Sequence, residues 1–141
     1  MGKNILREEI WKSFNVRRGE LYVAKLEGKG NQQKGKRAVV IYSNNGNNKK
    51  APTLNVIPLT SKNKELCVHV LLEGHGLKCP SMALLEQITT INKNQLVKRI
   101  GQVSKYDMQR IDAAADIQFG RAPVRRYTIK KIKKKNIRIA A

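Results

Sequence analysis

Polar residues that follow or precede predicted strands are the first candidates for chemistry in this chain. A loop at residues 28–36, rich in Gly, Asn, Gln and Lys, leads into Arg37 at the start of an apolar run. The segment Thr60-Ser61-Lys62 follows the end of another apolar run. An arginine at such a place can donate two hydrogen bonds to a phosphate, and a neighbouring hydroxyl could orient the substrate. The residue types alone therefore predict a phosphate-binding site of modest specificity.

The two histidines are weaker candidates for catalysis than these strand-end residues. A ribonuclease can use two histidines as general acid and general base, and this chain has two. His75 lies between two glycines in a predicted loop, whereas His69 alternates with Cys67 and Leu71 on a predicted strand. Spacing alone does not pair the two imidazoles, and His69 taken by itself is expected to be structural.

Other catalytic and metal-binding patterns are missing from the sequence. The chain has no P-loop, no GxSxG, no HExxH and no carboxylate cluster that would hold a metal. Cys67 and Cys79 lack the CxxC spacing of a zinc site, and two cysteines cannot form a disulfide framework. We therefore expect no metal, no cofactor, and thiols that are buried or idle.

Charge is the most informative bulk property. The chain has 29 Lys and Arg against 10 Asp and Glu, a net charge of +19. All the acids lie in residues 1–120, whereas residues 121–141 hold nine bases and no acid. A globular part with a basic tail is typical of a polyanion binder, and nucleic acid is the expected partner. A membrane surface is less favoured, because Tyr127 is the tail's only bulky aromatic residue. The remaining alternative is that the charge serves solubility only.

Length and composition predict one globular domain. The chain has 141 residues, of which 40% are hydrophobic. Its longest apolar run, Ala38 to Tyr42, is far shorter than the roughly 20 residues that span a membrane. Glu8 and Glu9 interrupt the place where a secretory signal would need its apolar stretch. We therefore expect a cytoplasmic protein.

The periodicity predicts a mainly β, α+β fold. Leu6, Ile10 and Phe14 lie on one stripe, which predicts a helix over 4–14. Residues 44–50 are expected to form a loop and 92–95 a helical turn. Short strands are predicted at 21–24, 37–43, 53–59, 66–72, 82–85 and 99–103. Strands of this length and spacing favour a small, strongly curved, barrel-like sheet.

A helix from Ser104 to about Gly120 is predicted to close the sheet. Ser104 with Asp107 resembles a capping box, and Gly120 is a typical stop. The predicted core stripe of this helix is Met108, Ile111, Ala115 and Phe119. Three parts of the chain result: an N-terminal helical extension at 1–17, a main domain at 18–120 and a basic tail at 121–141.

Several of these segments, in this order, resemble the MazF/PemK toxins, the mRNA interferases of bacterial toxin–antitoxin pairs. The segments are Arg18-Gly19-Glu20-Leu21-Tyr22, Gly35-Lys36-Arg37-Ala38-Val39-Val40-Ile41, Pro52-Thr53, Pro58-Leu59-Thr60-Ser61, Leu66-Cys67-Val68-His69-Val70 and Leu84-Leu85-Glu86-Gln87-Ile88-Thr89-Thr90-Ile91. No single motif is decisive, but their order and nearly gapless spacing over residues 18–120 are specific.

The resemblance implies a fold, an activity and partners. The fold would be an SH3-like curved sheet of the CcdB/MazF type, assembled as a homodimer. The activity would be metal-independent, sequence-specific cleavage of single-stranded RNA, inhibited by a cognate acidic antitoxin. By position, the resemblance implies that Arg37 and Thr60 are catalytic. It also implies RNA contacts from Asn31, Gln33, Lys36, Ser61, His69, Glu86 and Gln87.

The chain departs from the family pattern near the predicted site. A glutamate of the loop, sometimes proposed as a base, is Gln32 here, and Ala38 replaces the usual proline after the arginine. Thr89 stands where an arginine is common. These changes bear on the cut sequence and on the general base rather than on the fold. The alternative function is a non-catalytic member of the same fold, acting as a gyrase-poison-like protein or an RNA-binding regulator.

Overall fold

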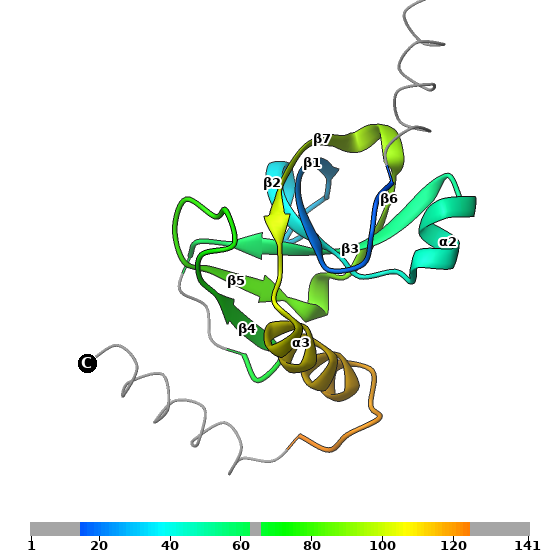
Figure 1. The fold of residues 1–141 in the computed structure, drawn as a ribbon. Coiled ribbons are helices and arrows are strands. Elements are labelled where there is room, and N and C mark those ends of the chain that lie inside the picture. Colours follow the sequence, from blue (N-terminus) through cyan, green and yellow to red (C-terminus); the bar gives the residue numbers. More distant parts are fainter. Residues whose placement is uncertain (1–14, 63–65, 125–141) are drawn as a thin grey trace, which may run out of the picture.

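A computed structural model describes residues 15–62 and 66–124 (Figure 1). The predicted helix at 4–14 and most of the basic tail lie outside the described residues. None of the helices in the described ranges is long and apolar enough to cross a membrane.

Seven antiparallel strands form the sheet in the described part of the chain. Their order is β4-β5-β3-β2-β1-β7, and β6 pairs with β3 off this path. The strands are β1 Glu20–Glu27, β2 Lys34–Ile41, β3 Thr53–Thr60, β4 His69–Leu72, β5 Ser81–Leu84, β6 Thr89–Asn92 and β7 Leu96–Gln102. The helices are α2 Asn45–Lys50 and α3 Lys105–Gln118, with 3-10 turns η1 Leu85–Gln87 and η2 Lys93–Gln95.

The mainly β fold is confirmed, although the sheet is not closed into a barrel. Figure 1 shows β1, β2 and β7 curling at one end of the molecule, while α3 lies beside β4. Strands β4 and β7 end the order and are not paired with each other. The curvature follows partly from register shifts between β1 and β7 at Leu21/Tyr22 and Val23/Ala24, because bulges increase twist and bend a strand.

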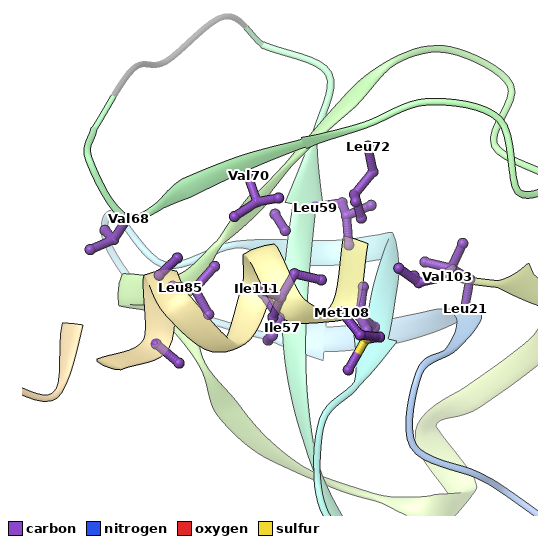
Figure 2. Packing of buried hydrophobic residues seen from close by; sticks show 14 residues of the cluster. Leu21, Ile57, Leu59, Val68, Val70, Leu72, Leu85, Val103, Met108 and Ile111 are labelled. Atoms are coloured by element: carbon purple, nitrogen blue, oxygen red, sulfur yellow. The ribbon is translucent and has the colours of Figure 1, made fainter. Parts of the chain in front are cut away.

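The apolar parts of strands β1 to β3 are buried on both faces, because each face packs against its own apolar cluster. The Leu21 face carries Leu21, Val40 and Ile57, and it packs against Met108 and Ile111 of α3 (Figure 2). The second face, called the Tyr22 face, is lined by Tyr22, Ala24, Leu26, Val39, Ile41, Leu54, Val56, Ile91 and Leu96. Alternating residues of a strand therefore belong to different clusters, and side chains beyond each cluster continue its face.

The predicted C-terminal helix is confirmed, with both end signals. The Ser104 hydroxyl accepts a hydrogen bond from the Asp107 N–H, and Gly120 has φ +75° just after the helix. Met108, Ile111 and Ala115 are buried as expected. The placement of Phe119 in the core stripe is wrong: its side chain follows the helix and is 56% exposed.

Two other predictions need correction. Residues 44–50 were expected as a loop, but 45–50 form helix α2, because the Asn44 side chain caps it by accepting the Asn47 N–H. Strand β6 was not predicted, since Ile91 is its only buried residue and gives no alternation.

Three predicted strand starts shift by three residues. Strand β2 begins at Lys34 rather than Arg37, so the predicted loop at 28–36 ends at Gln33. The strand predicted at 66–72 begins at His69, and the strand predicted at 99–103 begins at Leu96.

Candidate functional site

Arg37 and Thr60 lie just beyond the paired stretch of β2 and β3. These strands pair from Ile41 opposite Val56 to Val39 opposite Pro58, where the pairing ends. Extended by two residues in each strand, the same antiparallel register would set Arg37 opposite Thr60. Residues opposite each other in an antiparallel pair project to the same face. Both side chains therefore continue the Tyr22 face beyond its apolar cluster.

The Arg37 side chain is exposed, and one hydrogen bond to the backbone fixes its position. Its Nε donates a hydrogen bond to the Lys34 carbonyl oxygen, 3.1 Å away. The terminal guanidinium nitrogens have no hydrogen-bond or ion-pair partner among the described residues. The group is therefore oriented, yet it keeps the donors that bind a phosphate in a fork.

Thr60 is a buried hydroxyl at the end of β3. The residue is 4% exposed, and its Oγ1 accepts the N–H of Lys62 at 3.2 Å. Its backbone is fixed by pairing with Met82 of β5. The hydroxyl proton is left to donate, while Ser61 and Lys62 beside it are exposed.

The loop at 28–33 presents polar side chains next to β2. A side chain at Gly28 would clash with the Gln33 carbonyl oxygen, and Gly30 has φ +61°; both positions favour glycine. The Gln32 amide oxygen accepts the N–H of Lys29 at 2.9 Å. The Gln32 side chain thus stabilises the turn itself.

Turn η1 carries the other two predicted polar residues, and each bonds a different element. The Glu86 carboxylate lies 2.8 Å from His69 Nε2. Gln87 bonds the backbone of the 28–33 loop, through Gln33 N–H at 2.8 Å and the Asn31 carbonyl at 3.3 Å. Turn η1 therefore links β4 to the loop.

His69 has a polar neighbour at each ring nitrogen. The Leu66 N–H points to His69 Nδ1 at 3.2 Å, and His69 Nε2 lies 2.8 Å from the Glu86 carboxylate. The His69 side chain is 1% exposed and that of Glu86 27% exposed, so Glu86 is the member of the pair that reaches solvent.

Lys36 is set apart from the other predicted residues. It neighbours Arg37 in β2, so its side chain projects to the opposite face. There it lies opposite Lys25 of β1. Asn31 is exposed and Gln33 half-buried, and neither side chain has a hydrogen-bond partner among the described residues.

Two polar clusters on α3 went unnoticed in the sequence and are structural. Asp107 pairs with Arg110 at 2.9 Å and with His75 at 3.0 Å. Burial raises the pKa of Asp107, but the hydrogen bonds from Arg110 and His75 outweigh burial and hold that pKa below its usual value. His75 is thus tied to the helix and not to His69.

The second cluster joins α3 to the end of β2. Asp112 Oδ1 accepts the Tyr42 hydroxyl at 2.7 Å and Arg18 Nη2 at 2.6 Å. Burial, together with the hydrogen bond to Asp112, raises the pKa of Tyr42 to about 12. Only long-range pairing makes this cluster, so no local signal in the sequence reveals it.

The described residues contain no group of three or more His, Cys, Asp or Glu that could hold a metal ion. Cys67 is half-buried and Cys79 exposed, and neither forms a disulfide within the described ranges.

Comparisons with known proteins agree on one family. Residues 17–119 match the family model of the PemK-like, MazF-like toxin of type II toxin–antitoxin systems. The chain is 37% identical over 117 residues to "Endoribonuclease MazF" of Staphylococcus saprophyticus, covering 79% of this chain and 98% of that protein. It is 36% identical over 110 residues to the Staphylococcus epidermidis protein of the same name, covering 74% and 92%.

A solved structure shares the fold. It is a mycobacterial endoribonuclease in complex with its cognate antitoxin, with a TM-score of 0.66 and 22% identity. The match covers 78% of this chain and 99% of that one.

Proposed function

The chain belongs to the family of PemK-like, MazF-like toxins of type II toxin–antitoxin systems, and we propose that it is a sequence-specific endoribonuclease that cuts single-stranded RNA without a metal ion. The observation that carries this proposal is the pairing of β2 with β3 at Val39 and Pro58, because extending it by two residues in each strand would set the exposed Arg37 opposite Thr60. The name of the staphylococcal relatives supports the same activity.

The reaction needs no external nucleophile. The 2′-OH of the substrate attacks the adjacent phosphorus and loses its proton, while the bond from phosphorus to the 5′ oxygen breaks and that oxygen takes up a proton. The products are a 2′,3′-cyclic phosphate and a 5′-OH end. Because the nucleophile is part of the substrate, no metal-activated water is required.

Arg37 and Thr60 serve this reaction by charge and position. An arginine guanidinium is a poor base, but that of Arg37 can neutralise the phosphoryl oxygens and hydrogen-bond the leaving 5′ oxygen. The Thr60 hydroxyl holds the phosphate or the 2′-OH in line for attack. Electrostatic stabilisation and in-line positioning then supply most of the rate.

The predicted RNA contacts divide by exposure. Asn31, Gln33 and Ser61 face solvent in full or in part and are proposed to contact RNA directly. Glu86 borders the same region with the buried His69 behind it. Lys36, on the opposite face, is proposed to contact the RNA backbone away from the cut phosphate.

The proposed partners follow from charge and from the relatives. A chain at +19 favours an acidic segment that folds on binding, and one structural relative is solved with its cognate antitoxin. We propose that a cognate acidic antitoxin inhibits this protein, that the toxin is a homodimer, and that it acts in the cytoplasm.

One assay tests activity, metal dependence and specificity together. A long RNA is incubated with the protein in EDTA, and the new 5′ ends are mapped. The proposal predicts 5′-OH ends at one recurring short sequence. Cleavage that needs added Mg²⁺ contradicts metal independence, and binding without cleavage favours the non-catalytic alternative.

A further inference from the structure

Gln87 is the link between the 28–33 loop and the rest of the fold. Its Oε1 accepts the Gln33 N–H at 2.8 Å, and its Nε2 donates to the Asn31 carbonyl oxygen at 3.3 Å. Within residues 15–62 and 66–124, these are the only hydrogen bonds from the loop to another element. The other two loop bonds, between Lys29 and Gln32, are internal.

The backbone that carries Gln87 is itself fixed by neighbouring contacts. Leu85, at the start of η1, is 1% exposed, and its N–H bonds the Val68 carbonyl oxygen at 3.3 Å. Glu86 is paired with His69 of β4. The backbone that carries Gln87 is therefore held by the core on one side and by the Glu86–His69 hydrogen bond on the other, so its amide can impose a position on the loop.

Apart from the pairing of Glu27 with Lys34 at its ends and its two internal bonds, the loop has few contacts that define its shape. Asn31 is exposed, Gln33 is half-buried, and Gly30 adds conformational freedom. The carboxamides of Asn31 and Gln33 nevertheless have the donors and acceptors that read base edges in single-stranded RNA. Their direction depends on the backbone at Asn31 and Gln33, which is the backbone that Gln87 holds.

We propose that Gln87 is a positioning residue that determines the cut sequence by fixing the Asn31–Gln33 segment. This inference rests on the proposed function, because it assigns that segment to base recognition. Gln87 acts through the loop; it neither takes part in the chemistry nor has to touch the reacting phosphate.

The structure offers a matched control for this inference. Gln95 also bridges two backbone groups, accepting the Asn92 N–H at 2.8 Å and donating to the Lys25 carbonyl at 2.7 Å. It belongs to η2, which contributes no residue to the proposed site. Gln95→Ala therefore removes the same kind of contact without releasing the 28–33 loop.

The test compares Gln87→Ala, Gln87→Glu and Gln95→Ala by two readouts. Amide hydrogen exchange at Gln33 in the RNA-free protein reports the anchor, and mapped 5′ ends with kcat and KM report specificity. Gln87→Ala is expected to speed Gln33 exchange about tenfold, broaden the set of cut sequences and raise KM more than it lowers kcat. Gln87→Glu keeps the acceptor and is expected to retain slow exchange at Gln33, while Gln95→Ala changes neither readout.

Each contrary result has a distinct meaning. An unchanged rate of amide hydrogen exchange at Gln33 in Gln87→Ala would overturn the claim that Gln87 fixes the loop, whatever the effect on activity. Faster exchange with unchanged cut sites overturns the role in specificity and leaves the proposed function standing. Wild-type protein that binds RNA but does not cut it overturns the proposed function, and with it the role in specificity, while the exchange result still judges the anchor.

Discussion

The Arg37 side chain is fixed near its base and open at its tip. The bond from Nε to the Lys34 carbonyl orients the guanidinium, and its outer nitrogens face solvent. Such a group can meet the charge that develops on a phosphoryl oxygen without first reorganising, which is the main advantage of a preorganised site.

Removing Arg37 should therefore abolish cleavage without unfolding the protein. We expect Arg37→Ala to lower the rate at least about 10²-fold, because the exposed side chain contributes little to packing. Single-turnover cleavage of a short RNA measures the effect. Arg121→Ala removes the same charge from an exposed ion pair with Asp116 and should keep nearly full activity. A similar loss in both variants would show that net charge matters rather than the position of Arg37.

The sequence reveals some of these residues and hides others for a physical reason. Arg37 and Thr60 stand in local sequence motifs, so the sequence alone nominates both as candidates for the site. The role of Gln87 cannot be predicted from the sequence, because its two hydrogen-bond partners lie 54 and 56 residues away. The link between His75 and Asp107 is hidden in the same way, 32 residues apart.

Among the elements, α3 is tied to the sheet by polar contacts as well as by its apolar face. In the first turn of α3, the Asp107 carboxylate pairs with His75 and with Arg110. Arg110 also donates a hydrogen bond to the Leu71 carbonyl oxygen at 3.0 Å. These contacts hold the β4–β5 connection against the helix.

The acid sensitivity of the fold should depend on Asp107. Its pKa lies below the usual 3.8, so the folded state favours the carboxylate over its protonated form. That contribution is complete above the unfolded pKa and is lost as the pH falls through the folded pKa. In urea unfolding between pH 6 and about 3, Asp107→Asn should therefore show a smaller loss of stability on acidification than the wild type.

Asp116→Asn provides the control on the same helix. Its carboxylate is about half exposed and pairs with the exposed Arg121, so solvent screens the interaction. The wild-type acid dependence should persist in this variant. Equal flattening in both variants would contradict the assignment to Asp107.

The helices and strands differ in how clearly the sequence predicts them. Helix α3 is predictable because its cap, its buried stripe and its terminal glycine agree. Helix α2 is missed because its sequence, NGNNKK, has low helix propensity and depends on the Asn44 cap. Strand β6 is held by pairing with β3 from Thr53 to Val56, which no local pattern reports.

At the scale of the whole molecule, the charge is unevenly placed along the chain. Residues 125–141 carry eight bases and no acid. Basic side chains of this kind track a phosphate backbone and do not read bases. The tail should therefore add affinity for RNA and leave the cut sequence to the residues of the proposed site.

Truncation after Val124 tests the tail while keeping the contacts of Arg121 and Ala122 at the end of α3. If about four bases neutralise phosphates, the salt slope of binding should fall by roughly 3, at about 0.7 per contact on single strands. Binding is measured in an Arg37→Ala background to prevent cleavage, and cut sites are mapped with Arg37 present. A lower melting temperature with an unchanged slope would make the tail structural, and a shifted cut sequence would mean that it reads bases.

The central claim is that this protein cuts RNA through the substrate's own 2′-OH at a phosphate held by Arg37 and Thr60. The most direct measurement compares two oligonucleotides that carry the mapped cut sequence, one all-RNA and one with a single 2′-deoxy nucleotide 5′ of the cut. In EDTA, the all-RNA substrate should yield a 2′,3′-cyclic phosphate and a 5′-OH end, and the deoxy substrate should bind but stay intact. Cleavage of the deoxy substrate at the normal rate would contradict the account.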